Sequence, residues 1–279
     1  QERERKMKFL GSLFLVVVVL ALLTGPGHAL SINQADYDAV KGSLTYTADL
    51  LTDHSGGSGY SVYGISCGVV NGYLWVAVHT NFPKSGLTGS DSYASGNLFN
   101  PGDLYINVGG TFQTGGGSAY GVATTSHGNN VTQAYNTWGN PVVEGGLYSP
   151  AGGGPFFADG TYEVYEATLG VVSPSDGDGS IVKNSYPTMI RYGQAVAGDN
   201  SGTAYLANVG NPWNYDIVYK VSTAAIGYTG AQDLQLFWAM ECGNDGVECV
   251  KTGEVPEPAT MALVAAGVTA MAVRRKNIV

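Results

Sequence analysis

Residues 64–68, Gly-Ile-Ser-Cys-Gly, match the G-x-S-x-G pattern in which a serine acts as a nucleophile. That chemistry places the serine on a strained turn between a strand and a helix, within reach of a histidine and an acid. Here a β-rich run follows Ser66, and His54, His79 and His127 stand in no supporting pattern. We therefore interpret the match as a coincidence in a Gly- and Ser-rich chain, and we expect no catalytic residue.

Paired carboxylates could hydrolyse a glycosidic bond. Glu163 and Glu166 are three residues apart, so on one strand they would point to opposite faces. A pair of Glu144 with either of them stays open, although solvent-facing acids on outer strands are the simpler interpretation. We expect the protein not to be an enzyme, with a glycan-active enzyme as the weakest alternative.

Asp176 and Asp178 lie in an Asp-Gly-Asp-Gly turn that could offer oxygen ligands to Ca²⁺. The turn lacks the further spacing and the terminal Glu of an EF-hand loop. We therefore favour an ordinary turn and expect no metal or other cofactor, with Ca²⁺ at these two residues as the alternative.

The three cysteines, Cys67, Cys242 and Cys249, could form a disulfide only in an oxidising compartment. A turn after residues 233–241 could fold Cys249 back onto Cys242, and we favour that pair. A Cys67–Cys242 pair remains an alternative. Zinc would need a fourth ligand, for which the sequence offers no sensible spacing.

Several aromatic residues lie in or beside polar loops, where flat rings can stack on sugars. The candidates for glycan binding are Tyr93, Tyr135, Trp138 and Trp213. Core and cross-strand packing explain most tyrosines equally well. A carbohydrate-binding module is therefore the alternative to a purely structural role.

The elements that would position these residues are strands. The chain has 41 Gly and 18 Tyr, and its body is rich in strand and turn formers. We predict strands at residues 44–50, 60–66, 73–80, 103–109, 118–125, 142–148, 161–169, 187–196, 203–209, 215–224 and 233–241. Residues 73–78 are almost all apolar, as in a central strand, whereas residues 215–221 alternate as in an outer strand with one wet face. The expected fold is all-β, a single antiparallel β-sandwich or jelly-roll-like domain over residues 30–250, with one short helix at 34–40.

The N-terminal segment predicts export. Lys6 and Lys8 precede an apolar run at residues 9–23, and Gly-His-Ala at 27–29 is a small-x-small cleavage site. We expect a signal peptide helix over residues 1–29, recognised by the Sec translocon and cut by signal peptidase after Ala29. Met7 is the expected natural start.

The C-terminal segment, residues 251–279, is a linker followed by three ordered features. Val-Pro-Glu-Pro at 255–258 is extended because of its prolines, residues 259–273 are uncharged and apolar, and residues 274–279 form a basic tail. A helix of 15 residues spans roughly 22 Å, short of the ~30 Å bilayer core. Basic side chains at Arg274, Arg275 and Lys276 can snorkel to the headgroups and extend that transmembrane helix.

This tail resembles the PEP-CTERM sorting signal of Gram-negative bacteria. The resemblance implies that an exosortase recognises Pro256, Glu257 and Pro258 and removes the helix. The protein would be held transiently at the inner membrane before processing. Afterwards it would reach the outer surface or the extracellular matrix, where association with exopolysaccharide and biofilm is expected.

Charge excludes one class of partner. Eight of the 13 Lys and Arg residues lie in the two terminal segments, residues 1–29 and 251–279, whereas 18 of the 22 Asp and Glu residues lie between them. Such an acidic body repels phosphate backbones, so nucleic-acid binding is not expected. The sequence therefore predicts an exported, non-catalytic surface protein whose processing partners are better defined than its ligands.

Overall fold

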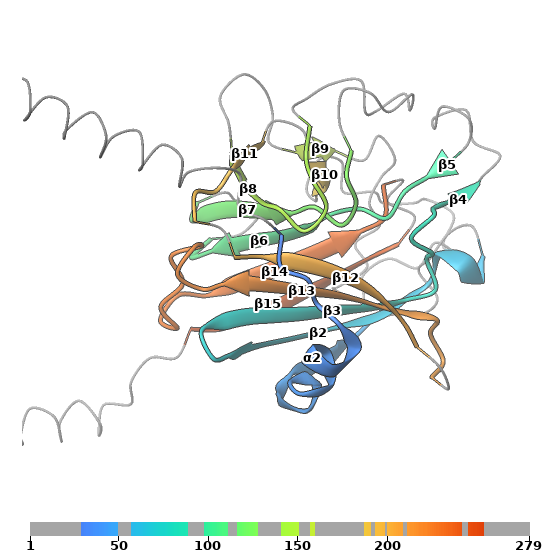
Figure 1. The fold of residues 1–279 in the computed structure, drawn as a ribbon, viewed down its shortest axis with the longest axis horizontal. Helices are drawn as coiled ribbons and strands as arrows, with labels where there is room; N and C mark the ends of the chain where they lie inside the picture. Colours follow the sequence, from blue (N-terminus) through green and yellow to red (C-terminus); the bar gives the residue numbers. More distant parts are fainter. Residues whose placement is uncertain are drawn as a thin grey trace, which may run out of the picture.

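A computed structural model describes residues 29–49, 57–88, 98–110, 116–127, 141–150, 157–159, 187–190, 193–198, 200–208, 211–241 and 245–253. These residues form mostly antiparallel β-structure, as predicted, with one short α-helix (Figure 1). The predicted signal helix, the sorting helix and the strand at 161–169 lie outside the described residues. Within the described ranges no helix is both long and apolar enough to cross a bilayer.

The first large sheet has five strands in the order β1-β2-β3-β13-β12. Their bounds are β1 (Thr45–Ala48), β2 (Val62–Val70), β3 (Tyr73–Thr80), β13 (Tyr215–Ser222) and β12 (Gly202–Ala207). Strand β3 lies between β2 and β13 and is buried over nearly its whole length, which confirms the prediction of a central strand.

The prediction that residues 215–221 form an outer strand was wrong. Strand β13 is paired on both sides, with β3 and with β12. On its polar face Asp216 is buried, and Lys220 is half-buried with its ammonium over the rings of Tyr73 and Trp75. The alternation does give the strand two different faces, but Asp216 on the polar face contacts His79, Asn208 and Trp213 and not solvent.

The second large sheet has six strands in the order β11-β8-β7-β6-β14-β15. The bounds are β11 (Gly193–Ala195), β8 (Leu147–Pro150), β7 (Ser118–Val122), β6 (Leu104–Val108), β14 (Leu234–Ala239) and β15 (Gly246–Lys251). Two small pairs complete the strands: β4 (Leu87–Thr88) with β5 (Leu98–Phe99), and β9 (Phe157–Asp159) with β10 (Pro187–Ile190).

The prediction of one strand at 187–196 was wrong. Two strands lie there, and β10 and β11 belong to different sheets. Strand β15 was not predicted as a strand. Its sequence, Gly-Val-Glu-Cys-Val-Lys, is short and mixed, and it gains its structure by pairing with β14 along six residues.

Both large sheets contribute side chains to one core. Ile65, Val76 and Ile217 from the five-stranded sheet pack in the same buried cluster as Ile106 and Leu236 from the six-stranded sheet. Alternation along each strand sends every second side chain to this interior. The two sheets therefore bury their apolar faces against each other.

A second cluster covers the outer face of the five-stranded sheet. Helix α2 (Gln34–Asp38) is capped at its N-terminus by Asn33, whose side chain accepts from the Asp36 N–H in a capping box. Tyr37 packs with Trp75 and Val218 of that outer face, and α2 lies below β2 and β3 in Figure 1. The sheet centre is thus buried on both faces.

Candidate functional site

Three polar residues meet on the outer face of the five-stranded sheet: Ser66 of β2, His79 of β3 and Asp216 of β13. The strand register explains their meeting, because His79 is opposite both Gly64 and Asp216, while Ser66 is opposite Ala77. Residues two positions apart on paired strands share a face and lie within reach of each other.

The hydrogen-bond order is that of a Ser-His-Asp triad. Ser66 Oγ lies 2.7 Å from His79 Nε2, and His79 Nδ1 lies 2.6 Å from Asp216 Oδ1. A carboxylate only accepts, so Nδ1 carries the proton and Nε2 of a neutral ring accepts from the Ser66 hydroxyl. All three residues are buried. The sequence prediction missed His79 and Asp216, although the shared outward face of three predicted strands was a signal that could have found them.

The Asp216 carboxylate is held by further donors. Trp213 Nε1 donates to Oδ1 at 2.7 Å and Asn208 Nδ2 donates to Oδ2 at 2.8 Å. The ring of His79 lies 4.6 Å from that of Trp213 and 5.5 Å from that of Tyr46. Burial, and then the charge of Asp216, raise the pKa of Tyr37. The triad is therefore enclosed by aromatic rings.

The backbone around Ser66 differs from that of a nucleophile elbow. Ser66 is in the middle of β2 and is paired with Tyr46 of β1 and with Ala77 of β3. Backbone N–H groups in a strand with two neighbours are used by the two ladders, so they are not free to form an oxyanion hole. The arrangement can hold three polar side chains in a fixed orientation, which favours a role in the fold over acyl transfer.

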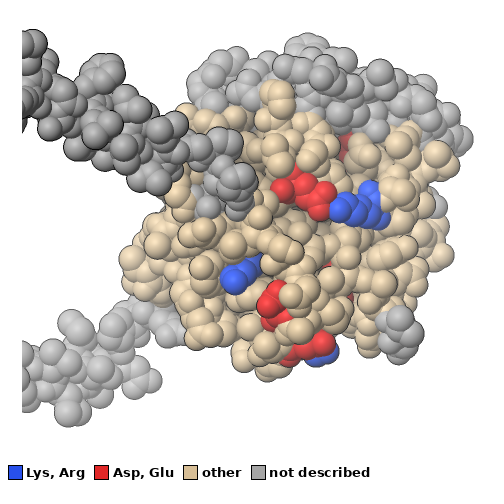
Figure 2. All heavy atoms as spheres, viewed as in Figure 1, with Lys and Arg blue, Asp and Glu red and all other residues tan. Residues whose placement is uncertain are grey.

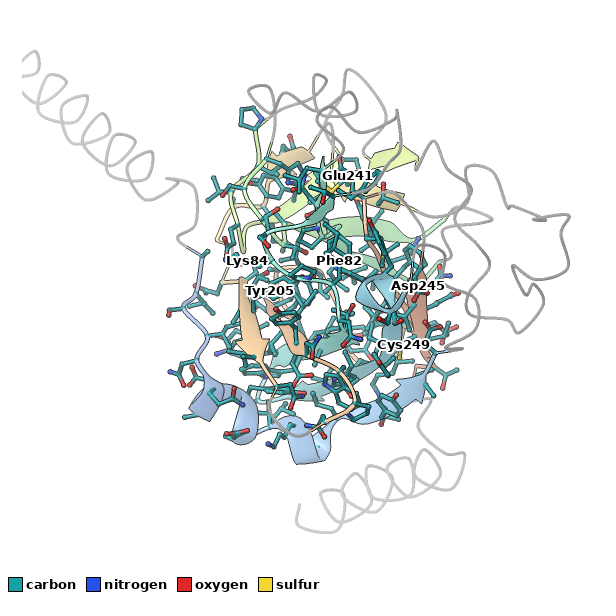
Figure 3. All side chains as sticks on the ribbon, turned by 90° about the vertical axis from the view of Figure 1, so that its right-hand side faces the viewer. Phe82, Lys84, Tyr205, Glu241, Asp245 and Cys249 are labelled. Atoms are coloured by element: carbon teal, nitrogen blue, oxygen red, sulfur yellow. The ribbon has the colours of Figure 1, made fainter. Side chains whose placement is uncertain are left out.

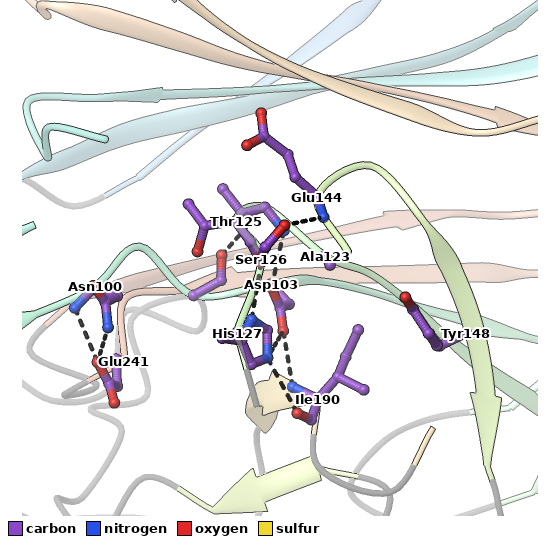
Figure 4. A network of polar contacts seen from close by, with 12 residues as sticks. Asn100, Asp103, Ala123, Thr125, Ser126, His127, Glu144, Tyr148, Ile190 and Glu241 are labelled. Carbon is purple, nitrogen blue, oxygen red and sulfur yellow. Dashed lines mark hydrogen bonds and ion pairs between the residues drawn. The ribbon is translucent and has the colours of Figure 1, made fainter. Parts of the chain in front are cut away.

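A second buried network lies at one end of the six-stranded sheet (Figure 4). Asp103, which directly precedes β6, accepts from the Thr124 N–H at 2.9 Å and from the Ile190 N–H at 2.8 Å. His127 Nε2 lies 3.3 Å from Asp103 Oδ2 and 3.2 Å from the Ile190 carbonyl oxygen, and its Nδ1 lies 2.9 Å from the Thr125 carbonyl oxygen. Both ring nitrogens of His127 therefore lie within hydrogen-bonding distance of oxygen atoms.

Two further groups tie this network to the rest of the molecule. Thr124 Oγ1 donates to the Gly102 carbonyl oxygen and lies 2.6 Å from the Tyr219 hydroxyl of the other sheet. The carboxylate of Glu241 accepts from the backbone and side-chain nitrogens of Asn100, both at 2.9 Å. Burial raises the pKa of Asp103 and of Glu241, and their hydrogen bonds and His127 only partly oppose it.

No group of three or more His, Cys, Asp or Glu residues suited to a metal ion occurs among the described residues. The Ca²⁺ candidates Asp176 and Asp178 lie outside them, as do Glu163 and Glu166. Glu144 is described, and its carboxylate pairs with Lys84 Nζ at 2.6 Å. On the face drawn in Figure 2, charged side chains form small separate groups in a mostly uncharged surface.

Of the four predicted glycan-binding aromatics the structure describes Trp213, which is half-buried and belongs to the Ser66–His79–Asp216 network. Tyr93, Tyr135 and Trp138 lie outside the described residues. Ala29, the predicted cleavage residue, is the first described residue, and the sorting residues Pro256, Glu257, Pro258, Arg274, Arg275 and Lys276 lie beyond the last.

Among the described residues the structure brings together two of the three cysteines, Cys67 and Cys249. The Sγ atoms of Cys67 and Cys249 lie 2.7 Å apart in the shared core. Cys242 lies outside the described residues, so the predicted Cys242–Cys249 and Cys67–Cys242 pairs remain predictions.

The fold thus defines an all-β protein whose polar networks are largely internal. Residues 254–276 match the family model of the PEP-CTERM protein-sorting motif. The chain is therefore a PEP-CTERM sorting domain-containing protein, and the motif indicates an exported surface protein that depends on an exosortase. No curated protein and no solved structure shows significant similarity to this chain.

Proposed function

We propose that this protein is an exosortase-processed component of the cell surface or extracellular matrix, without catalytic activity and associated with exopolysaccharide. The sorting motif carries the proposal, because it begins at residue 254, with only two residues between it and the end of β15 at Lys251. A folded β domain joined this closely to a sorting signal would remain at the membrane until the tail is cut.

Two features support a structural role for the domain. The sharing of one core by two antiparallel sheets supports classing it as a β-sandwich. The pairing of Ser66 with both neighbouring strands supports the absence of acyl-transfer chemistry. Signal peptidase and the Sec translocon would act at the N-terminus, and exosortase at the C-terminus.

The sorting step can be tested by replacing residues 256–258 with alanines in the full chain, expressed in a host with an exosortase. The expected product is a longer form that stays with the inner membrane, detected by cell fractionation and by mass spectrometry of its C-terminus. Alanines at residues 41–43, which are exposed and lie outside the motif, serve as the control and should mature normally. Normal maturation of the 256–258 variant would contradict exosortase processing.

Polysaccharide association is a separate step with its own test. The purified protein should be retained on the insoluble exopolysaccharide of its own producer cells. The variants Tyr135→Ala and Trp138→Ala should lose retention at an unchanged unfolding midpoint, as expected for aromatic stacking on sugars. Equal retention of wild type and variants would remove Tyr135 and Trp138 from the binding role, and no retention at all would remove the association.

A further inference from the structure

Strand β15 is the strand from which the chain leaves the domain. It forms one edge of the six-stranded sheet and is hydrogen-bonded along its length to β14. The sorting motif begins at residue 254, and β15 ends at Lys251. Any pull on the tail therefore acts first on an edge strand, which can peel away residue by residue when it has one neighbour.

Contacts at its beginning and at Cys249 join this strand to the opposite sheet. At its beginning, the Asp245 carboxylate accepts a 2.6 Å hydrogen bond from the N–H of Val62, the first residue of β2. Four residues later, Cys249 Sγ lies 2.7 Å from Cys67 Sγ, also of β2. β15 therefore lies along β2 across the core, and Figure 3 shows Asp245 and Cys249 on the same side of the molecule.

Alternation explains why the two thiols face each other. Cys67 follows Ile65 on the inner face of β2, and Cys249 follows Val247 on the inner face of β15. The sulfur atoms are closer than two sulfur atoms in ordinary non-bonded contact, so the backbones already hold them within bonding reach.

We propose that Cys67 and Cys249 form a disulfide that joins the two sheets and fastens the strand carrying the sorting tail. The proposal rests on the export part of the proposed function, because a structural disulfide persists in an oxidising compartment. It would pass a pull on the tail from β15 to β2, so that detaching the strand would require the sheets to separate.

The oxidant is a disulfide-bearing thiol oxidoreductase of the exported compartment, or oxidised glutathione in vitro. Hydrogen bonds from Cys67 and from the Thr47 hydroxyl lower the pKa of Cys249, so its thiolate attacks one sulfur of the oxidant and releases the other as a thiol. Cys67 then loses its proton, attacks Cys249 Sγ and releases the second thiol. The two protein thiols are oxidised, and one oxidant disulfide is reduced to two thiols.

A groove on the described surface leads to the pair. Both cysteines line this groove of about 370 Å³ together with Thr45, Thr47 and Lys251. The side chains themselves are buried, so oxidation is expected during folding or through local opening at this groove. Once formed, the bond would be slow to reduce for the same reason.

Peptide mapping of the exported protein under non-reducing conditions, after alkylation of free thiols, tests the pairing. A cross-linked peptide pair containing Cys67 and Cys249 is expected, with the alkyl group on Cys242. The Cys242→Ser variant should keep this link. A link from Cys242 to either other cysteine would overturn the proposal, and so would alkylation of both Cys67 and Cys249 if the link is also missing after refolding in a redox buffer.

Two measurements on purified protein test whether the disulfide stabilises the fold and fastens β15. Reductant should lower the unfolding midpoint of wild type and of Cys242→Ser by ~5–10 °C and leave Cys67→Ser unchanged. Hydrogen exchange should become faster in β15 on reduction while the other edge strand, β11, keeps its rate. An equal loss of protection in both edge strands, or no thermal shift, would contradict a local fastening of β15.

Refolding the reduced chain in a glutathione redox buffer separates the two proposals. If the Cys67–Cys249 link forms in the buffer and is missing from protein taken from cells, the pairing stands and export to an oxidising compartment fails. If the link is missing from both, the pairing itself is wrong.

Discussion

Ser66 Oγ and His79 Nε2 lie 2.7 Å apart across the β2–β3 hairpin, and Asp216 completes the hydrogen-bonded series from the strand on the other side of β3. Their order is that of a catalytic triad. Their setting, in the middle of a fully paired sheet and between the rings of Tyr46 and Trp213, is that of a buried polar network.

Ser66→Ala should therefore change stability. The substitution leaves His79 Nε2 in the buried network without its partner, and we expect a loss of about 1–3 kcal/mol in the free energy of unfolding. Urea denaturation measures it. Ser43→Ala, at an exposed position, is the control and should stay within ~0.5 kcal/mol of wild type. Equal midpoints for both variants would mean that the Ser66–His79 contact does not contribute to stability.

The same serine should not react as a nucleophile. A fluorophosphonate probe, which labels activated serines, is expected to leave wild-type protein unlabelled, because Ser66 has no free backbone donors beside it to stabilise an oxyanion. Labelling of wild type that disappears in Ser66→Ala would establish a reactive serine and would contradict the non-catalytic proposal.

Gly102 should tolerate no side chain. A Cβ atom there would lie 1.8 Å from the Ala239 carbonyl oxygen, and the Gly102 carbonyl oxygen already accepts from Thr124 Oγ1 and Trp238 Nε1. We expect Gly102→Ala to cost at least about 3 kcal/mol or to prevent folding. Gly42→Ala, where no atom lies within 4 Å of the added Cβ, should be neutral in the same thermal unfolding assay. A stable Gly102→Ala protein would show that the backbone at Ala239 can move.

Local patterns predicted where several strands lie, but they gave no prediction of which strands pair. The run of residues 73–80 was predicted with its observed bounds, because nearly continuous apolar residues leave one interpretation. Strand β15 was missed, since Glu248 and Lys251 interrupt its apolar residues and its structure comes from pairing with β14.

The polar sites depend on strand order, which a single sequence does not contain. His79 and Asp216 are 137 residues apart and meet because β13 inserts between β3 and β12. Cys67 and Cys249 are 182 residues apart and belong to different sheets. The G-x-S-x-G match drew attention to Ser66, but its neighbours could be found only after the strands were paired.

The described residues do not test the alternative of a Ca²⁺ site at Asp176 and Asp178. If Asp176 and Asp178 bind Ca²⁺, adding EDTA should lower the unfolding midpoint and adding Ca²⁺ should restore it, because a ligand that binds the folded chain stabilises it. The double variant Asp176→Asn, Asp178→Asn should then not respond to EDTA. A wild-type midpoint that EDTA leaves unchanged supports an ordinary turn.

The buried carboxyl groups should make the protein more stable in mild acid. Burial raises the pKa of Glu241 and of Asp103 above their ordinary values. Between the ordinary and the raised pKa the folded chain binds more protons than the unfolded chain, so the free energy of unfolding falls as pH rises through that window. The unfolding midpoint at pH 5 should therefore exceed that at pH 7.

Glu241→Gln isolates one carboxyl group from this pH dependence. The amide oxygen can still accept from both nitrogens of Asn100, so the contact is kept while the ionisation is lost. The difference in midpoint between pH 5 and pH 7 should shrink. Glu144→Gln makes the same charge change at a partly exposed carboxylate paired with Lys84, and it corrects for general repulsion in an acidic domain. Equal pH dependence in the two variants would show that Glu241 does not carry the effect.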